Sequence, residues 1–178
     1  MFAKGMPLIL AITLVGTPAV GQPTSSPIPN FGKITPLPNA AMQPDPEVEY
    51  RVAFNITKAA AKPDQVNQGL EKVARYINLL ASAEVHPRNG NVWAVVHGKA
   101  TDVVLKDNAF QRKHGVSNPN IALIEALGKA GVQVHVCGQA LAGQQIPRAD
   151  VYTGVTVDLS ALVTLTTLQQ RGWSVISD

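Results

Sequence analysis

From residue 49 onward, short apolar runs alternate with segments whose apolar residues recur at helical spacing, and this alternation limits the fold more than any other feature. The runs predict strands over residues 50–56, 92–97, 132–136, 155–157 and 173–176. The spacing predicts helices over 66–80, 101–113, 121–130 and 159–168, with one helical turn over 139–142. Strands that alternate with such helices form βαβ units. We therefore expect an α/β fold with a five-stranded, mainly parallel, doubly wound sheet and helices on both faces.

Several residues are predicted to begin or end these helices. Pro63 is expected at the first position of the first long helix, where a missing N–H costs nothing. Asn118, followed by Pro119, is expected to cap the helix over 121–130, and Asp158 the helix over 159–168. Gly172 suits the left-handed position that ends a helix.

The first 48 residues differ in composition from the rest of the chain. Residues 1–21 have the pattern of a signal peptide: Lys4, an apolar stretch over 6–15, and small residues at 19 and 21. The stretch is shorter than the roughly 20 residues of a membrane span. We expect the mature protein to be periplasmic or secreted, with no integral membrane span. Residues 22–48 contain seven prolines and predict a linker that is disordered or wrapped on a partner subunit. The α/β domain then covers residues 49–178.

The charge pattern and the motifs exclude several classes of function. The net charge is only +3, and basic residues are interleaved with acidic ones, so we expect no nucleic-acid partner. The chain has no G-x-G-x-x-G, P-loop or G-x-S-x-G motif, and we expect no cofactor.

Cys137 is the only cysteine, and it follows the third expected strand. In open α/β sheets, ligands bind outside the carboxyl ends of the strands. Asn55 and His97 end the first two strands, so they and Cys137 are expected at one edge, which Asn118 can also approach. No intramolecular disulfide can form, so Cys137 is buried and inert, paired between chains, or reactive.

The residues after Cys137 bear on its reactivity. A helical turn beginning at Gly138 and Gln139 would place the sulfur beside unpaired N–H groups, which favour the thiolate. Gly138 would let a substrate sulfur approach the backbone closely. The alternative is a packed structural cysteine. His97, His135 and Cys137 together offer a soft metal site, but the sequence has no metal-binding spacing motif, and we expect no metal.

Five short segments resemble the DsrE/DsrF-like family, and the resemblance extends from Tyr50 to Asp178. The segments are residues 95–100 (VVHGKA), 118–120 (NPN), 131–141 (GVQVHVCGQAL), 154–155 and 172–173. The resemblance implies a flavodoxin-like fold that assembles into homotrimers or hexamers. It also implies, from the sulfur-relay branch, that Cys137 carries sulfur as a persulfide between a donor and an acceptor protein.

The chain differs from the relay branch in two respects: it carries an export signal, and it continues Cys-Gly-Gln where that branch is more apolar. We therefore expect an exported sulfur carrier with Cys137 and His97 as reactive residues. Asn55, Gly98, Asn118, Gly138 and Gln139 are the expected binding residues. The alternative is a non-enzymatic, oligomeric module that binds a small ligand and has a structural cysteine.

Overall fold

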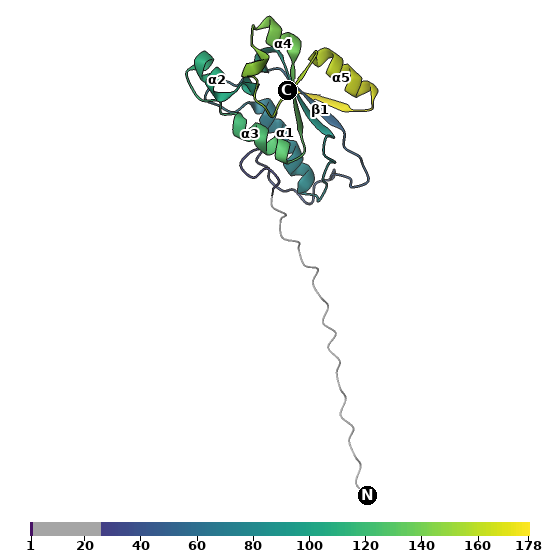
Figure 1. Ribbon diagram of the computed structural model, residues 1–178. Coiled ribbons are helices and arrows are strands. Elements are labelled where there is room, and N and C mark those ends of the chain that lie inside the picture. The colour runs from purple at the N-terminus through teal and green to yellow at the C-terminus, as the bar shows by residue number, and fades with distance from the viewer. Residues whose placement is uncertain (2–25) are drawn as a thin grey trace.

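The expected sheet is present. The computed structural model describes Met1 and residues 26–178, so most of the predicted signal peptide lies outside the described residues. Five strands form one sheet in the order β4-β3-β2-β1-β5, and all their pairings are parallel (Figure 1). The strands are β1 (Val52–Ile56), β2 (Val92–Val96), β3 (Gln133–Cys137), β4 (Thr156–Asp158) and β5 (Ser174–Ser177).

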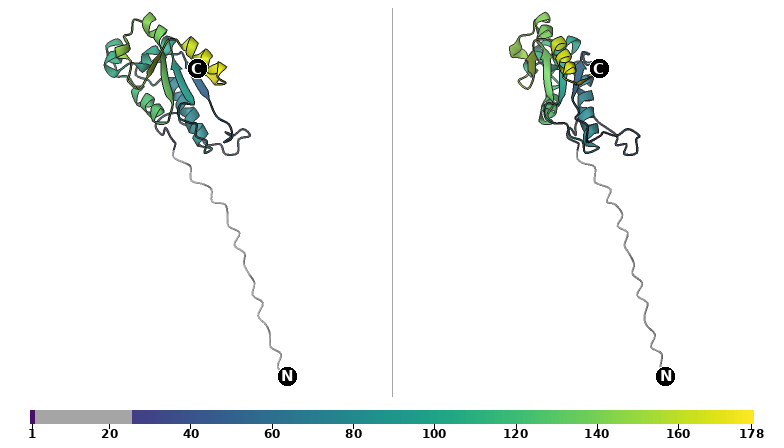
Figure 2. Two further views of the ribbon diagram at one scale, coloured as in Figure 1. Left: turned by 45° about the vertical axis from the view of Figure 1, so that its right-hand side comes forward. Right: turned by 90° about the vertical axis from the view of Figure 1, so that its right-hand side faces the viewer.

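Helices cover both faces of this sheet (Figure 2). The helices are α1 (Gln68–Ala81), α2 (Asp107–His114), α3 (Ile121–Lys129), α4 (Gly138–Gly143) and α5 (Ala161–Gln170). Two 3₁₀ helices, η1 (Gly98–Val104) and η2 (Arg148–Asp150), lie in the connections. The doubly wound α/β class predicted from the alternation is confirmed.

The two faces differ in how much apolar surface they bury. Side chains alternate along each strand, and one set, including Phe54, Val96 and Val136, joins α1 and α3 in the main core. The other set faces α5, where Val95, Cys137 and Ala161 form a much smaller cluster. The α5 side of the sheet is therefore the thinly covered one.

The strand order explains why α5 lies on this second face. β1 to β4 follow one another across the sheet, but β5 returns to pair with β1. A right-handed crossover in that reverse direction must pass over the opposite face. The connection after β3 leads to α4, whose Leu141 belongs to the main core, while the connection after β4 leads to α5. The chain thus switches faces between the ends of β3 and β4, beside Cys137.

Three predicted helix starts are wrong, because the helices begin a few residues later, after Asn67, Asn120 and Ser160. α1 begins after Asn67, whose side chain accepts from the N–H groups of Gly69 and Leu70, so Pro63 stays in the loop. Asn118 does not cap α3, which follows Asn120. Ser160, rather than Asp158, caps α5 by accepting from Leu162 N–H at 3.2 Å.

The helix expected over 101–113 is two pieces, η1 and α2, with a break at Leu105. Leu105 pairs with Val151 as an isolated antiparallel bridge. The Asn118 amide donates to the carbonyl groups of Val103 and Leu105, at 3.0 and 2.7 Å. These contacts satisfy backbone groups that a continuous helix would pair internally, so they stabilise the break.

The proline-rich segment is more ordered than its composition suggests. Its described part, 26–48, has no helix or strand, but Ile28 is only 1% exposed. Buried Asn78 of α1 accepts from Ile28 N–H and donates to the carbonyl groups of Ile28, Phe31 and Gly32. The expectation of disorder is therefore wrong for residues 28–32, because one apolar side chain and one amide dock them onto α1 of the same chain.

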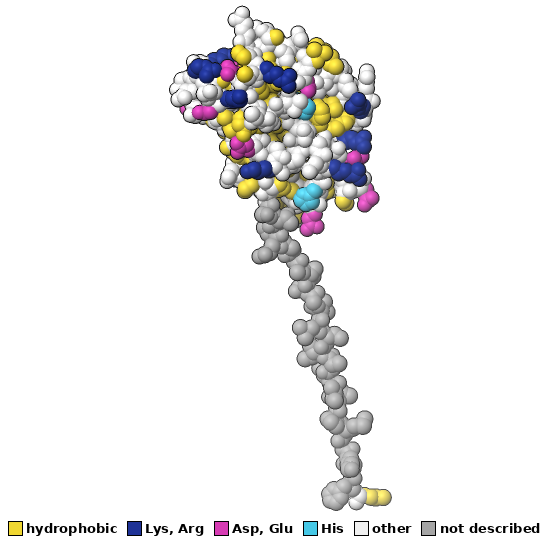
Figure 3. Space-filling model, in the orientation of Figure 1, with side chains coloured by type: hydrophobic (Ala, Val, Ile, Leu, Met, Phe, Trp, Pro, Cys, Tyr) yellow, Lys and Arg dark blue, Asp and Glu magenta, His cyan; other side chains and the backbone are white. Residues whose placement is uncertain are grey.

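Basic and acidic side chains are mixed on the surface, as they are along the sequence. On the face drawn in Figure 3, basic side chains lie among acidic ones without forming a continuous stripe. Among the described residues, none of the helices has the length and apolarity needed to cross a bilayer.

Candidate functional site at the carboxyl edge of the sheet

Polar side chains from neighbouring strands line the carboxyl edge on the α5 face. Cys137 of β3 is in register with Asp158 of β4, and Asn55 of β1 with Ser177 of β5. His97 and Cys137 directly follow Val96 and Val136, which form the last pair between β2 and β3. The rule that parallel strands gather their ends at one edge thus brings Asn55, His97 and Cys137 to the same side of the sheet.

Asn55 orients the His97 ring. Asn55 Oδ1 lies 2.6 Å from His97 Nε2, and Asn55 Nδ2 donates to Ser177 Oγ at 3.3 Å. Because Oδ1 can only accept, Nε2 carries a proton, and the neutral ring presents Nδ1 as its acceptor. Burial lowers the pKa of His97 below its ordinary value, although the charge of Asp178 acts in the opposite direction. His97 is therefore a neutral proton acceptor near pH 7.

Asp178 closes the end of β1 next to this pair. Its carboxylate accepts from Thr57 N–H at 3.0 Å, from the Thr57 hydroxyl at 2.8 Å and from Lys58 N–H at 2.9 Å. Burial alone would raise the pKa of Asp178, but these hydrogen bonds and the charge of Lys58 together lower it. An ionised Asp178 thus fixes the backbone that follows Asn55.

Cys137 lies under α5 and is 6% exposed. Its neighbours are mostly apolar and include Val95, Ala161 and Leu165. The nearest polar partner is Ser160 Oγ, at 4.0 Å from Sγ. Although Cys137 is the N-cap residue of α4, its side chain makes no capping hydrogen bond. The thiol therefore packs against α5 instead of pointing at the start of α4.

A second polar group ties α5 to the sheet beside Cys137. His135 Nδ1 lies 2.9 Å from Asp158 Oδ1, and Asp158 Oδ2 accepts from the Thr164 hydroxyl of α5 at 2.6 Å. The His135 ring is also stacked on Trp93, with ring centroids 3.9 Å apart. Asp158 thus links β3, β4 and α5 at the switch point.

The structure places the remaining predicted residues differently. A Cβ on Gly138 would lie 2.6 Å from the Asp158 carbonyl oxygen, so glycine is required there for chain packing. Gly98 has a φ of +60°, and its carbonyl oxygen accepts from Thr101 and Gln144 side chains. Gln139 is exposed on α4. Asn118 is buried; its Nδ2 donates to the loop carbonyl groups described above, and its Oδ1 accepts from the backbone N–H and the side-chain amide of Asn120.

The alternative of a metal site depends on His97, His135 and Cys137. No three His, Cys, Asp or Glu side chains in the described part of the chain converge as ligands for an ion. His97 Nε2 is bound to Asn55, and His135 Nδ1 to Asp158.

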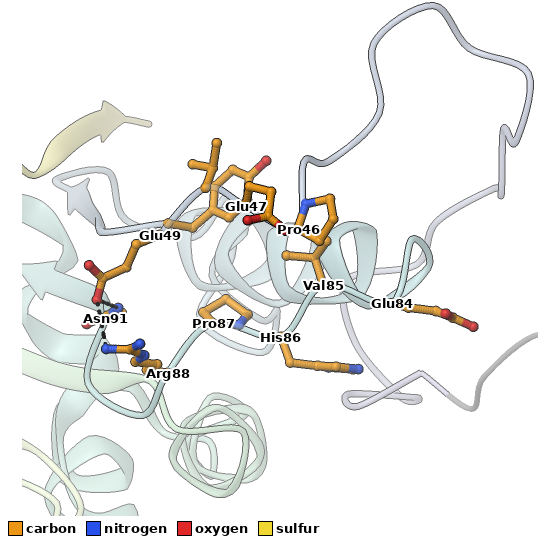
Figure 4. A pocket seen from close by; sticks show the side chains of 11 residues that line it. Pro46, Glu47, Glu49, Glu84, Val85, His86, Pro87, Arg88 and Asn91 are labelled. Carbon is orange, nitrogen blue, oxygen red and sulfur yellow. Dashed lines mark hydrogen bonds and ion pairs between the residues drawn. The ribbon is translucent and has the colours of Figure 1, made fainter.

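A separate hollow lies at the opposite end of the sheet, between residues 46–50 and the loop after α1 (Figure 4). Its main polar group is Glu49, which accepts from Asn91 at 3.2 Å and pairs with Arg51 and with Arg88. The Asn91 hydrogen bond, followed by that of Arg51, lowers the pKa of Glu49. These groups already satisfy one another, and of the described residues that line the hollow, the exposed His86 is the only one with a thiol or an imidazole. The carboxyl edge is the better candidate site.

Four residues of the carboxyl edge were missed by the sequence reasoning: Asp158, Ser160 and Thr164 on the β3–β4 side, and Ser177 beside Asn55. Asp158 and Ser177 end β4 and β5, so the same strand-end rule could have found them. Ser160 and Thr164 could not be found in this way, because they reach this edge only through the placement of α5 over the sheet.

These features define a class: a doubly wound α/β domain with one cysteine at the switch point of a parallel sheet. The family comparison agrees, since the DsrE/DsrF-like family model matches residues 44–177. The chain belongs to the DsrE/DsrF-like family.

Solved structures support the fold assignment. The protein of unknown function MTH1491 from Methanobacterium thermoautotrophicum is 22% identical, with a TM-score of 0.56 over 72% of this chain and 99% of its own. The ychN protein from E. coli is 16% identical, with a TM-score of 0.51 over the same shares of the two chains. None of the curated proteins compared with the chain matches it.

Proposed function

We propose that this protein is an exported sulfur carrier that holds sulfane sulfur on Cys137 as a persulfide. The observation that carries the proposal is that Cys137 and a neutral, Asn55-oriented His97 lie at the carboxyl edge of the sheet, at the ends of the neighbouring strands β3 and β2. Membership of the DsrE/DsrF-like family supports it.

The transfer needs no external oxidant or reductant. His97 Nδ1 accepts the Cys137 proton, and the thiolate attacks the outer sulfur of a donor persulfide, R–S–SH. A new S–S bond forms on Cys137 as the donor's S–S bond breaks, and the donor leaves as a thiolate that takes up a proton. The products are Cys137–S–SH and R–SH. The chain has no second cysteine, so the persulfide cannot collapse into an intrachain disulfide.

One observation favours the alternative of a non-enzymatic, ligand-binding module. Cys137 is 6% exposed and packs against Val95 and Ala161. A thiol in such a position is unreactive unless α5 moves. The two functions therefore differ in whether a reagent in solution can reach Cys137 while the protein is folded.

The test exposes purified protein to a polysulfide donor under native conditions and measures the intact mass. We expect a gain of about 32 Da that reducing agent removes and that Cys137→Ser abolishes. In parallel, alkylation by iodoacetamide is followed in the folded and the urea-unfolded protein.

The two readouts decide between the functions. A Cys137 that gains sulfur and is alkylated in the folded state supports the carrier. A Cys137 that reacts only after unfolding overturns the carrier and supports a structural cysteine.

Export and assembly belong to the same proposal. The signal peptide predicts a periplasmic or secreted protein. Assembly into a homotrimer or hexamer is supported by three apolar side chains that are exposed beside the site: Leu159 (71% exposed), Leu162 (75%) and Val163 (52%). We call these three residues the α5 patch.

A further inference from the structure

A small cavity of about 150 Å³ lies beyond the carboxyl ends of β1 and β2, on the main-core side of the sheet. The loop after β1 forms one wall, with Ala59 and Pro63, and η1 and α2 form the other, with Val103 and Phe110. It does not include Cys137, which faces α5. Its position is nonetheless one where α/β sheets bind ligands.

The walls are mainly apolar, and two of their apolar side chains are buried. Val103 is 4% exposed, and Phe110 is 4% exposed and contacts the His114 ring at a centroid distance of 4.4 Å. A cavity of about 150 Å³ with apolar walls can hold a benzene ring. The size therefore suits one small ring or a branched chain of similar volume.

The charges at the rim are positive. Lys62 and Lys99 line the cavity, and neither makes an ion pair or a side-chain hydrogen bond among the described residues. The only acidic residue of the lining is Asp102, which is already paired with Lys113 at 2.6 Å and His114 at 3.0 Å. Two free cations thus face an apolar cavity whose one carboxylate is neutralised.

We propose that this cavity binds a small organic anion with an apolar body, such as an aromatic or branched-chain carboxylate. The ring or branched chain packs between Pro63 and Phe110, and the carboxylate lies at the rim between Lys62 and Lys99. The exposed Gln65 amide, which also lines the cavity, can donate to the same carboxylate. The site is independent of the chemistry proposed for Cys137.

The test is an NMR titration of the full protein with three probes that share a ring and differ in charge: benzoate, benzyl alcohol and benzylammonium. We expect saturable shifts of the amides of residues 59–65 and 99–103, with benzoate the tightest ligand and benzylammonium the weakest. Lys62→Gln or Lys99→Gln should weaken benzoate binding about threefold, and the double variant about tenfold. Neither substitution should change the binding of benzyl alcohol.

Two controls keep the outcome decisive. Lys129→Gln removes a cation from the far end of α3 and should leave benzoate binding unchanged. Cys137→Ser should also leave it unchanged, so the cavity can fail or succeed separately from the sulfur carrier. Equal affinity for the three probes, shifts confined to other residues, or no saturation would each overturn the proposal.

Discussion

At the scale of single residues, burial disfavours the charged form of His97, and the contact with Asn55 determines which ring nitrogen carries the proton. Oδ1 of Asn55 accepts from Nε2–H and offers the ring no charge, while burial lowers the pKa of His97. Because the charged ring is disfavoured, His97 stays neutral down to a pH below its ordinary value of 6.5. In the proposed role of proton acceptor for Cys137, it would be active only in this neutral form.

Persulfide formation should therefore lose rate only as the pH falls below 6.5, through the lowered pKa of His97. Asn55→Asp places a carboxylate against Nε2–H and favours the imidazolium. The fall in rate at acid pH, which we call the acid limb of the profile, therefore moves to higher pH. At about pH 5.5 the variant should be slower by about tenfold, with little difference near pH 8. The pH profile of the mass gain and the NMR titration of the His97 ring measure both effects.

Asn55→Ala is the matched control, because it removes the contact without adding a charge. Its acid limb should not move to higher pH. If Asn55→Asp and Asn55→Ala shift the profile equally, or if Asn55→Asp leaves it unchanged, His97 does not receive the Cys137 proton.

At the scale of elements, α5 decides whether Cys137 can be reached. Of the ten residues of α5, only Ala161 and Leu168 are buried, so packing holds this helix weakly. The hydrogen bond from Thr164 to Asp158 is its strongest polar tie to the sheet, at 2.6 Å. Few buried contacts make local opening of such an element inexpensive compared with global unfolding.

Thr164→Val removes this tie while preserving the shape of the side chain. A hydrogen bond to a charged partner contributes about 1.5–3 kcal/mol, so the open state should become at least about tenfold more populated. Alkylation of Cys137 in the folded protein should accelerate by the same factor. The control is Thr166→Val, whose hydroxyl bonds only to carbonyl groups of its own helix. Equal rates for the two variants would show that α5 does not limit access.

The elements also separate what the sequence could and could not predict. Strands and long helices follow from local periodicity, and all five strands lie within a few residues of the predicted ranges. The break at Leu105 depends on Val151, far along the chain, and on the Asn118 amide. The docking of Ile28 depends on Asn78 in the same way. No local pattern contains these long-range contacts.

At the scale of the whole molecule, the grouping of the strand-end residues does not depend on the strand order, whereas the covering of Cys137 does. Parallel strands have their carboxyl ends at the same edge of the sheet whatever their order. Asn55, His97 and Cys137 could therefore be grouped from the sequence. The covering of Cys137 by α5 follows from the return of β5 to the far side of β1. That return depends on which edge of the sheet accepts the last strand, and the sequence pattern does not specify it.

The pairing of β5 with β1 also leaves the α5 patch exposed to solvent, next to the thinly covered face of the sheet. A single exposed leucine is common, but three neighbouring apolar side chains beside the site indicate a contact surface. Burying one leucine contributes about 1.5–3 kcal/mol. In a self-assembly, the double substitution Leu159→Ser and Leu162→Ser should weaken association by more than about a hundredfold. Sedimentation velocity over a range of concentrations should show an assembly for the wild type and monomers for this variant.

Leu79→Ser is the matched control, since Leu79 is 43% exposed on α1 and lies away from α5. It should leave the sedimentation coefficient unchanged, because it removes a leucine of the same type from a surface that the proposed contact does not use. A monomeric wild type, or a control that dissociates as readily as the double variant, would contradict assembly through α5. Because the patch adjoins Cys137, assembly through it would also place part of a neighbouring subunit at the entrance to the thiol, so the alkylation rate of Cys137 should then depend on protein concentration.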